Sequence, residues 1–345
     1  MIRNKLLIFL IMKGVSFKSL SGRWIFLFLL VCYCVEGTLA GNPIRKGLPE
    51  YGIRDCHIYV EKGKYYMVGT EIAPPGENKE GISLYESKDM KKWKKTSLLV
   101  DRKSIPADSW YKDGFDSPEI HKINGRYVLC FGGRNNEVNP YSTTETVVAI
   151  SDKIQGPYKI VTDKPVVKGN RFTLWQDDKD GKVYAYWEKD GSLCGALMDT
   201  ALTHLAGEPV VIAIPRQFRK DDRFLDSPSV LKYKGKIYLF YTVFKGGYYA
   251  ANLVSESPLG PWKASDEILF YRSEDQAPTQ LHGEYDNPLV FAPPCEIIGN
   301  VQLFKGLNDK WYISYHSEDK YAEPFFCVDR VYPDENGFKC AITLP

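Results

Sequence analysis

The segment Gly235-Lys236-Ile237-Tyr238-Leu239-Phe240-Tyr241 decides the fold of this chain. It reads as a tight turn followed by a strand, because β-branched and aromatic residues follow a glycine turn. The same pattern occurs five times, at residues 63–70, 125–131, 181–187, 235–241 and 309–315. A pattern that recurs at such long intervals indicates one structural unit per copy.

Further strands surround each copy of the repeat. A short apolar strand precedes the turn, as at 58–60 and 229–232, and a second strand pair follows most copies, as at 82–86 and 250–255. Four strands per unit and no long segment of helical periodicity predict an all-β, five-bladed β-propeller. A β-sandwich built from similar hairpins is the alternative.

The bulk composition excludes some classes of function. The 345 residues carry a formal net charge of +2, and lysines and arginines are scattered among acidic residues. A nucleic-acid-binding protein would carry a basic patch or run, so we expect no nucleic acid partner. Aromatic residues make up 14% of the chain, which suits half-buried strands and also sugar-binding clefts.

The first forty residues have the pattern of a signal peptide. Basic residues precede an apolar run at 24–35, and small residues follow at Thr38 and Ala40. We expect cleavage before Gly41, so that 1–40 is the signal and 41–345 is the propeller domain. The protein would then be exported to the periplasm or beyond, without stable membrane insertion; an uncleaved anchor is the alternative.

Six cysteines follow the predicted cleavage point: Cys56, Cys130, Cys194, Cys295, Cys327 and Cys340. None has CxxC spacing, so we expect buried thiols and assign no metal ligands. A hairpin between Cys327 and Cys340 is the one disulfide worth testing.

Acidic residues occupy corresponding places in three repeats. Asp55 lies eight residues before Gly63, while Asp116 and Asp226 each lie nine residues before their turn glycines. Arg171 takes the corresponding place in blade three, and Gly299-Asn300 takes it in blade five. Since the first strand of each blade lines the channel, we expect these side chains to meet at one mouth. Alternatively, an aspartate before Ser-Pro caps a turn.

Two motifs resemble glycoside hydrolase family 43: Arg54-Asp55 in blade one and Ser117-Pro118-Glu119-Ile120-His121 in blade two. The resemblance covers nearly all of the mature chain. It implies a five-bladed propeller with an inverting mechanism, in which an aspartate base in blade one and a glutamate acid in blade four act with a tuning aspartate in blade three. Asp55 matches the base. Asp226, one methylene shorter than glutamate, matches the acid.

The chain departs from this family pattern in three blades. Arg171-Phe172 stands where the tuning aspartate is expected, Asp116-Ser117-Pro118-Glu119 replaces Trp-Ala-Pro-acid, and Asn300 is the nearest substitute for a channel histidine. Asp116 or Glu119 can replace the tuning aspartate by raising the acid's pKa. Arg171 would bind a uronic acid or sulfate, or form an ion pair with Asp116 or Asp226.

The sequence thus predicts a glycosidase with Asp55, Asp226, Asp116 and Glu119 as catalytic carboxylates. The substrate-binding candidates are Arg171, Trp175, Trp110, Asn300 and His316. No cofactor is required, and no residue supports a calcium ion in the channel. We expect an exo-acting or debranching arabinofuranosidase, xylosidase or galactosidase on plant or microbial glycans; an inactive carbohydrate-binding propeller is the alternative.

Overall fold

A computed structural model describes residues 42–138, 144–220, 222–243, 249–265, 270–271, 298–318, 323–333 and 337–341. The predicted signal peptide lies outside the described residues. The unit that carries the site is Ala40–Pro345.

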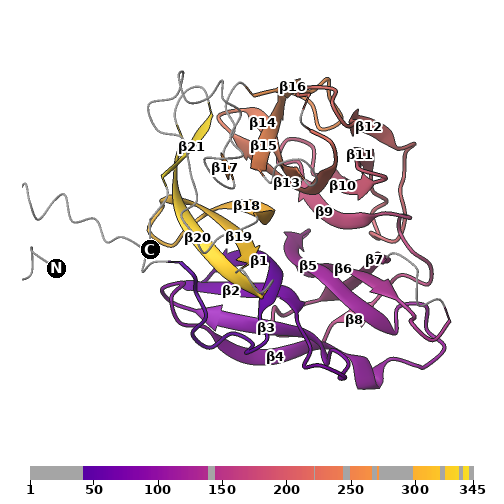
Figure 1. Ribbon diagram of the computed structural model, residues 1–345. Coiled ribbons are helices and arrows are strands. Elements are labelled where there is room, and N and C mark those ends of the chain that lie inside the picture. Colours follow the sequence, from indigo (N-terminus) through magenta and orange to yellow (C-terminus); the bar gives the residue numbers. More distant parts are fainter. Residues whose placement is uncertain are drawn as a thin grey trace, which may run out of the picture. The chain divides into compact units, whose positions relative to one another are not determined.

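Five antiparallel sheets follow one another along the chain and surround a centre, as predicted for a propeller (Figure 1). Blade one contains β1 (Ile53–Glu61), β2 (Lys64–Glu71), β3 (Gly81–Ser87) and β4 (Lys94–Asp101). Blade two contains β5 (Asp113–Ile123), β6 (Arg126–Arg134), β7 (Glu145–Ser151) and β8 (Lys159–Ile160). A single 3₁₀ turn, η2 (Arg102–Ser104), joins these two blades within the described part of the chain.

The remaining blades repeat this order. Blade three contains β9 (Asn170–Gln176), β10 (Val183–Lys189), β11 (Ser192–Leu197) and β12 (Val210–Ala213). Blade four contains β13 (Leu225–Tyr233), β14 (Lys236–Val243), β15 (Tyr249–Ser255) and β16 (Lys263–Ala264), with β17 (Phe270–Tyr271) also paired to β15. Blade five contains β18 (Gly299–Lys305), β19 (Trp311–Glu318), β20 (Pro324–Pro333) and β21 (Phe338–Ala341).

The hydrophobic core lies between neighbouring blades. Four clusters of buried aliphatic and aromatic side chains fill the interfaces from blade one to blade five. The segment before β1 reaches blade five, where the Ile44 N–H donates to the Phe326 carbonyl at 2.9 Å and Trp93 packs edge-on against the Phe326 ring. Packing of blade five against the start of the chain closes the ring without a free sheet edge at this point.

The first strand of each blade lines the central channel. A cavity of about 370 Å³ is bounded by residues of β1, β5, β9, β13 and β18. Each of these strands contains a non-glycine residue with a positive φ near its start: Asp55, Ser117, Arg171, Ser227 and Asn300, with Phe115 as a second one in β5. Register shifts mark β-bulges there in all five strands. A bulge redirects side chains and is common beside active sites.

The cysteine prediction is borne out in part. Cys56, Cys130 and Cys194 are buried free thiols. Cys340 lies opposite Val331, whereas Cys327 lies opposite Tyr315. Four residues along β20 separate Cys327 from Val331, about 13 Å by strand rise, so the register of this hairpin does not place the pair suggested for testing opposite each other.

Candidate active site

Asp55 is fully enclosed at the start of β1. Its side chain is 1% exposed, and its Oδ2 accepts a hydrogen bond from the Thr70 hydroxyl at 2.9 Å. Its backbone N–H donates to Nδ1 of His316 at 3.1 Å. Arg54 Nε lies 3.7 Å from Oδ2. These contacts hold the carboxylate in one orientation.

Arg171 joins two of the predicted catalytic carboxylates. Its Nη1 forms an ion pair with Asp55 Oδ1, and its Nε lies 3.6 Å from Asp226 Oδ2. Nη1 also contacts the Ser117 hydroxyl of blade two. The guanidinium therefore ties together the inner strands of blades one, two, three and four. The predicted ion pair with Asp226 is present, and Asp55 is its second partner.

The two carboxyl groups have opposite pKa shifts. Burial raises the pKa of Asp55, but the Arg171 guanidinium, His316, Arg54 and the Thr70 hydrogen bond together outweigh burial and hold that pKa well below its usual range. Burial also raises the pKa of Asp226, and Arg171 opposes this only in part, because the Asp55 charge adds to the increase. Asp55 is thus ionised near neutral pH, whereas Asp226 holds its proton more strongly than a free aspartate.

Asp116 lies beside this group and pairs with a lysine. Lys79 Nζ contacts Asp116 Oδ1 at 2.5 Å and also donates to the Gly114 carbonyl at 2.9 Å. The Asp116 charge raises the pKa of Arg171, although less than Asp55 and Asp226 do. Asp116 therefore faces the same group of charges, and Lys79 offsets its negative charge.

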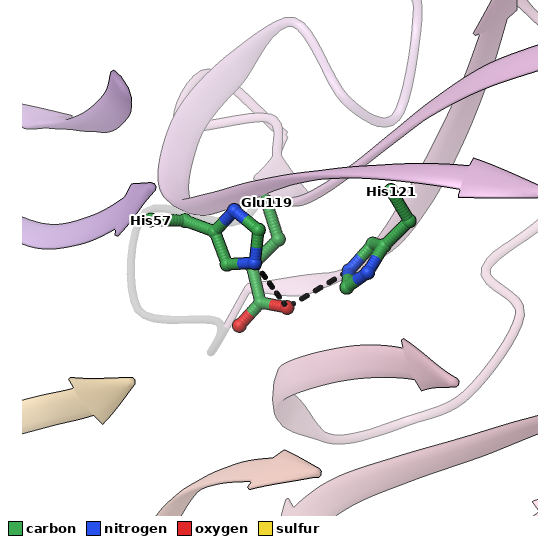
Figure 2. A group of neighbouring side chains, drawn as sticks. All are labelled: His57, Glu119 and His121. Carbon is green, nitrogen blue, oxygen red and sulfur yellow. Dashed lines mark hydrogen bonds and ion pairs between the residues drawn. The ribbon is translucent and has the colours of Figure 1, made fainter. Parts of the chain in front are cut away.

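Glu119 points toward two histidines and not toward Asp226. His121 Nε2 lies 3.0 Å from Glu119 Oε2, and His57 Nε2 lies 3.9 Å from the same oxygen (Figure 2). Burial raises the pKa of Glu119, but its contacts with His121 and His57 outweigh burial and lower it. An ionised Glu119 is poorly suited to donate a proton, and its contacts in the described part of the structure are with the two histidines, which does not support the tuning role expected from the sequence.

The remaining candidates have separate environments. His316 lies behind Asp55, and a Cβ added at Gly299 would come within 2.0 Å of its ring, so this glycine is needed for the close approach. Burial lowers the pKa of His316 to about 4, which leaves the imidazole neutral. Asn300 is buried at the bulge of β18. Blade five thus does supply a histidine near this site, but it is His316 of β19 and not the residue at the Asn300 position.

The predicted tryptophans do not gather around Arg171. Trp175 lies four residues farther along β9, about 13 Å by strand rise, where it lines the channel cavity and packs against Tyr184. The Trp110 indole N–H donates to the Asp163 carbonyl at 3.1 Å, and its ring packs edge-on against Tyr111. Both rings therefore have packing roles.

Two residues that the sequence reasoning missed complete the site. Thr70 lies opposite Arg54 in the β1–β2 register, and besides binding Asp55 its hydroxyl accepts the Ser117 N–H at 2.7 Å. Glu188 lies on β10 opposite Asn170, with burial and then the Asp226 charge raising its pKa. Blade three thus supplies a carboxyl group near Asp226 from its second strand. Both residues could have been found from the repeat, because Thr70 is the last residue of the copy at 63–70 and Glu188 directly follows the copy at 181–187.

Comparison with known proteins identifies the family. The model of glycosyl hydrolases family 43 matches residues 41–333. A search of curated protein sequences found no match.

Solved structures show the same fold at low sequence identity. A thermostable family-43 glycoside hydrolase is 20% identical, with coverage of 85% of this chain and 94% of that one and a TM-score of 0.68. An endo-1,4-beta-xylanase from Bacteroides thetaiotaomicron is 20% identical, covering 89% and 97% with a TM-score of 0.67. An endo-arabinase from the same organism is 20% identical, covering 86% and 99% with a TM-score of 0.65. The family match over most of the chain, together with this five-bladed fold, makes the protein a member of glycoside hydrolase family 43, a glycosidase that acts on carbohydrate.

Proposed function

We propose that the protein hydrolyses glycosidic bonds with inversion, using Asp55 as the general base and Asp226 as the general acid. The observation that carries this proposal is the opposite pKa shift of two carboxyl groups held by one arginine. A pair of titratable groups pushed apart in this way is typical of acid and base partners. Asp55 is ionised and can accept a proton from water, whereas Asp226 can donate one to the leaving oxygen.

The charge balance favours a neutral sugar over an acidic one. The Arg171 guanidinium already faces Asp55 and Asp226, and the Asp116 charge adds to the negative field around it. A uronic acid or sulfate group would have to compete with these carboxylates, and its own charge would meet theirs at close range. We therefore assign Arg171 to holding the carboxylates and not to binding an anionic substrate.

The substrate class follows from this balance and from the neighbours' activities. Two of the similar structures are named as an endo-1,4-beta-xylanase and an endo-arabinase. We propose a neutral arabinose-, xylose- or galactose-containing glycan of plant or microbial origin, attacked at a chain end or a branch.

A panel of aryl glycosides and oligosaccharides tests the activity, with proton NMR of the first product formed. We expect release of one neutral sugar whose anomeric configuration is opposite to that of the substrate. A retained configuration would refute the assignment of Asp55 as base. Hydrolysis of uronides in preference to neutral glycosides would refute the role given to Arg171.

The second candidate is a carbohydrate-binding propeller that has lost hydrolysis. The observation that favours it is the position of Arg171, which contacts both carboxylates needed for catalysis. Binding of an oligosaccharide from the panel by calorimetry, without product release over a long incubation, would support this candidate over the first.

Export of the protein is also a proposal. It is supported by the basic and apolar pattern of residues 1–40, followed by small residues at the expected cleavage point. We propose that the mature enzyme acts in the periplasm or outside the cell. In the part of the chain that the structure describes, no helix has the length and apolar character needed to cross a membrane.

A further inference from the structure

Three side chains with metal-binding atoms meet on the wall of the channel. His57 belongs to β1, two residues beyond Asp55, and Glu119 and His121 belong to the facing strand β5. One ligand atom from each residue lies within 4.8 Å of the other two. Figure 2 shows the Glu119 carboxylate between the two imidazole rings. None of the three contacts Arg171 or Asp226 in the described structure, so the cluster is separate from the acid and base pair.

The distances fit one small metal ion. A tetrahedral zinc ion with bonds of about 2.0 to 2.1 Å keeps its ligand atoms about 3.3 Å apart. Glu119 Oε2 lies 3.0 Å from His121 Nε2 and 3.9 Å from His57 Nε2. These two separations lie within about 0.6 Å of the zinc value, and the nitrogens of His57 and His121 lie within 4.8 Å of each other.

The charge of Glu119 also points to a cation. Its side chain is 8% exposed, and among the described residues its ion-pair partners are the two histidines alone. A buried carboxylate is costly unless it is paired or coordinates a metal. Two imidazoles and one carboxylate suit zinc and related transition metals better than calcium, which prefers oxygen ligands.

The residues around the cluster leave space for a metal ion and orient the His57 ring. His57 and His121 both line the channel cavity of about 370 Å³, which leaves space for water at an open coordination position. The Gln302 amide is fixed by the backbone of Ile58, whose N–H it accepts at 2.6 Å and whose carbonyl it binds at 2.9 Å. The Gln302 amide donates toward His57 Nε2 at 3.1 Å, a contact that a metal ion at this nitrogen would replace, and the Ile120 N–H lies 3.4 Å from His57 Nδ1. These contacts hold the His57 ring facing Glu119.

We propose that His57, Glu119 and His121 bind one divalent transition-metal ion of the zinc class in the central channel. The ion would link the inner strands of blades one and two. This site does not depend on the roles proposed for Asp55 and Asp226.

The test measures metal binding directly. The purified full chain is stripped with a chelator, dialysed and titrated with ZnCl₂ by calorimetry, and the bound zinc is counted by elemental analysis. We expect about one zinc ion per chain and a higher melting temperature with zinc. His57→Asn should weaken binding by more than about 100-fold, beyond the loss typical for an outer partner of a ligand.

A matched variant and a second metal complete the design. His204 is an exposed histidine beside Asp199, outside the cluster, so His204→Asn should bind zinc like the parent protein. Circular dichroism checks folding, and His121→Asn replaces His57→Asn if that variant does not fold. The proposal is overturned if the parent protein binds no zinc, if it binds calcium in preference to zinc, or if the folded cluster variant binds zinc as well as His204→Asn does.

Discussion

Removal of the Arg171 guanidinium should destabilise the protein strongly at neutral pH. Arg171 forms its ion pair with the ionised Asp55, and two charges about 4 Å apart at an effective dielectric of about 20 attract by about 4 kcal/mol. The cost of burying the two charges offsets much of this attraction. Loss of one partner from a buried pair typically costs about 3–5 kcal/mol, and we expect a value in this range for Arg171→Gln.

The stability cost of removing Arg171 should depend on pH, because Arg171 shifts the pKa of Asp55. The folded-state pKa of Asp55 is lowered, so its contribution is present above the unfolded pKa of about 3.9 and is lost as the pH falls through the folded pKa. Without Arg171, burial dominates and the pKa of Asp55 rises above its unfolded value. The variant should then gain stability as the pH falls through the raised pKa. The difference between the two proteins should therefore be larger at pH 7 than at pH 4.

Urea unfolding of both proteins at the two pH values measures this difference. Lys95→Gln is the control, because Lys95 pairs with Glu80 at 2.9 Å on the surface, with side chains 43% and 71% exposed. Loss of this exposed pair should cost at most about 1 kcal/mol. The reasoning is refuted if Arg171→Gln costs no more than the control at pH 7, or if its cost is the same at both pH values.

The remaining predictions concern catalysis and export. Asp55→Asn should abolish hydrolysis of every glycoside. Asp226→Asn should lower the rate about 10²–10⁴-fold on natural glycosides and less on activated aryl glycosides. If Glu119→Gln shows this leaving-group dependence while Asp226→Asn stays nearly as active as the parent protein, the general acid lies in blade two instead. Glu188→Gln removes a carboxyl group near Asp226, so the alkaline limb of the kcat/KM profile should move to lower pH, and an unchanged limb would disprove this coupling. Protein recovered from the native host should begin at or near Gly41 by amino-terminal sequencing; retention of Met1 or Met12 in a membrane fraction would indicate an anchor instead.

The fold could be predicted because each blade repeats the same hairpin pattern. The site could be predicted in part for the same reason, since side chains at the start of the inner strands converge whatever their separation in sequence. The structure does bring Asp55, Arg171 and Asp226 together. The alternation of inward- and outward-facing side chains along a strand, in contrast, does not show where a bulge adds a residue.

The missed residues depend on strand register. Thr70 and Glu188 belong to the second strands of their blades, opposite Arg54 and Asn170. A side chain on a second strand reaches the mouth only if the pairing places it beside the bulge, and pairing is a property of the folded sheet. The same holds for His57, whose partners lie on the neighbouring blade.

The five bulges show that the aspartates at the channel mouth do not occupy equivalent positions in their blades. The residue with positive φ is Asp55 in blade one and Arg171 in blade three. In blade four it is Ser227, and in blade two Ser117 and Phe115 both have positive φ, on either side of Asp116. Asp116 and Asp226 therefore lie one residue before the bulge position and are not equivalent to Asp55.

This offset also bears on how the proposed acid keeps its proton. Arg171 occupies the bulge of the blade in which the family pattern expects an aspartate, and its charge alone would lower the pKa of Asp226. Burial of Asp226 together with the Asp55 charge outweighs Arg171, so the net pKa of Asp226 is raised. An arginine in this position is thus compatible with a protonated Asp226, because it neutralises Asp55 more strongly than it attracts the proposed acid.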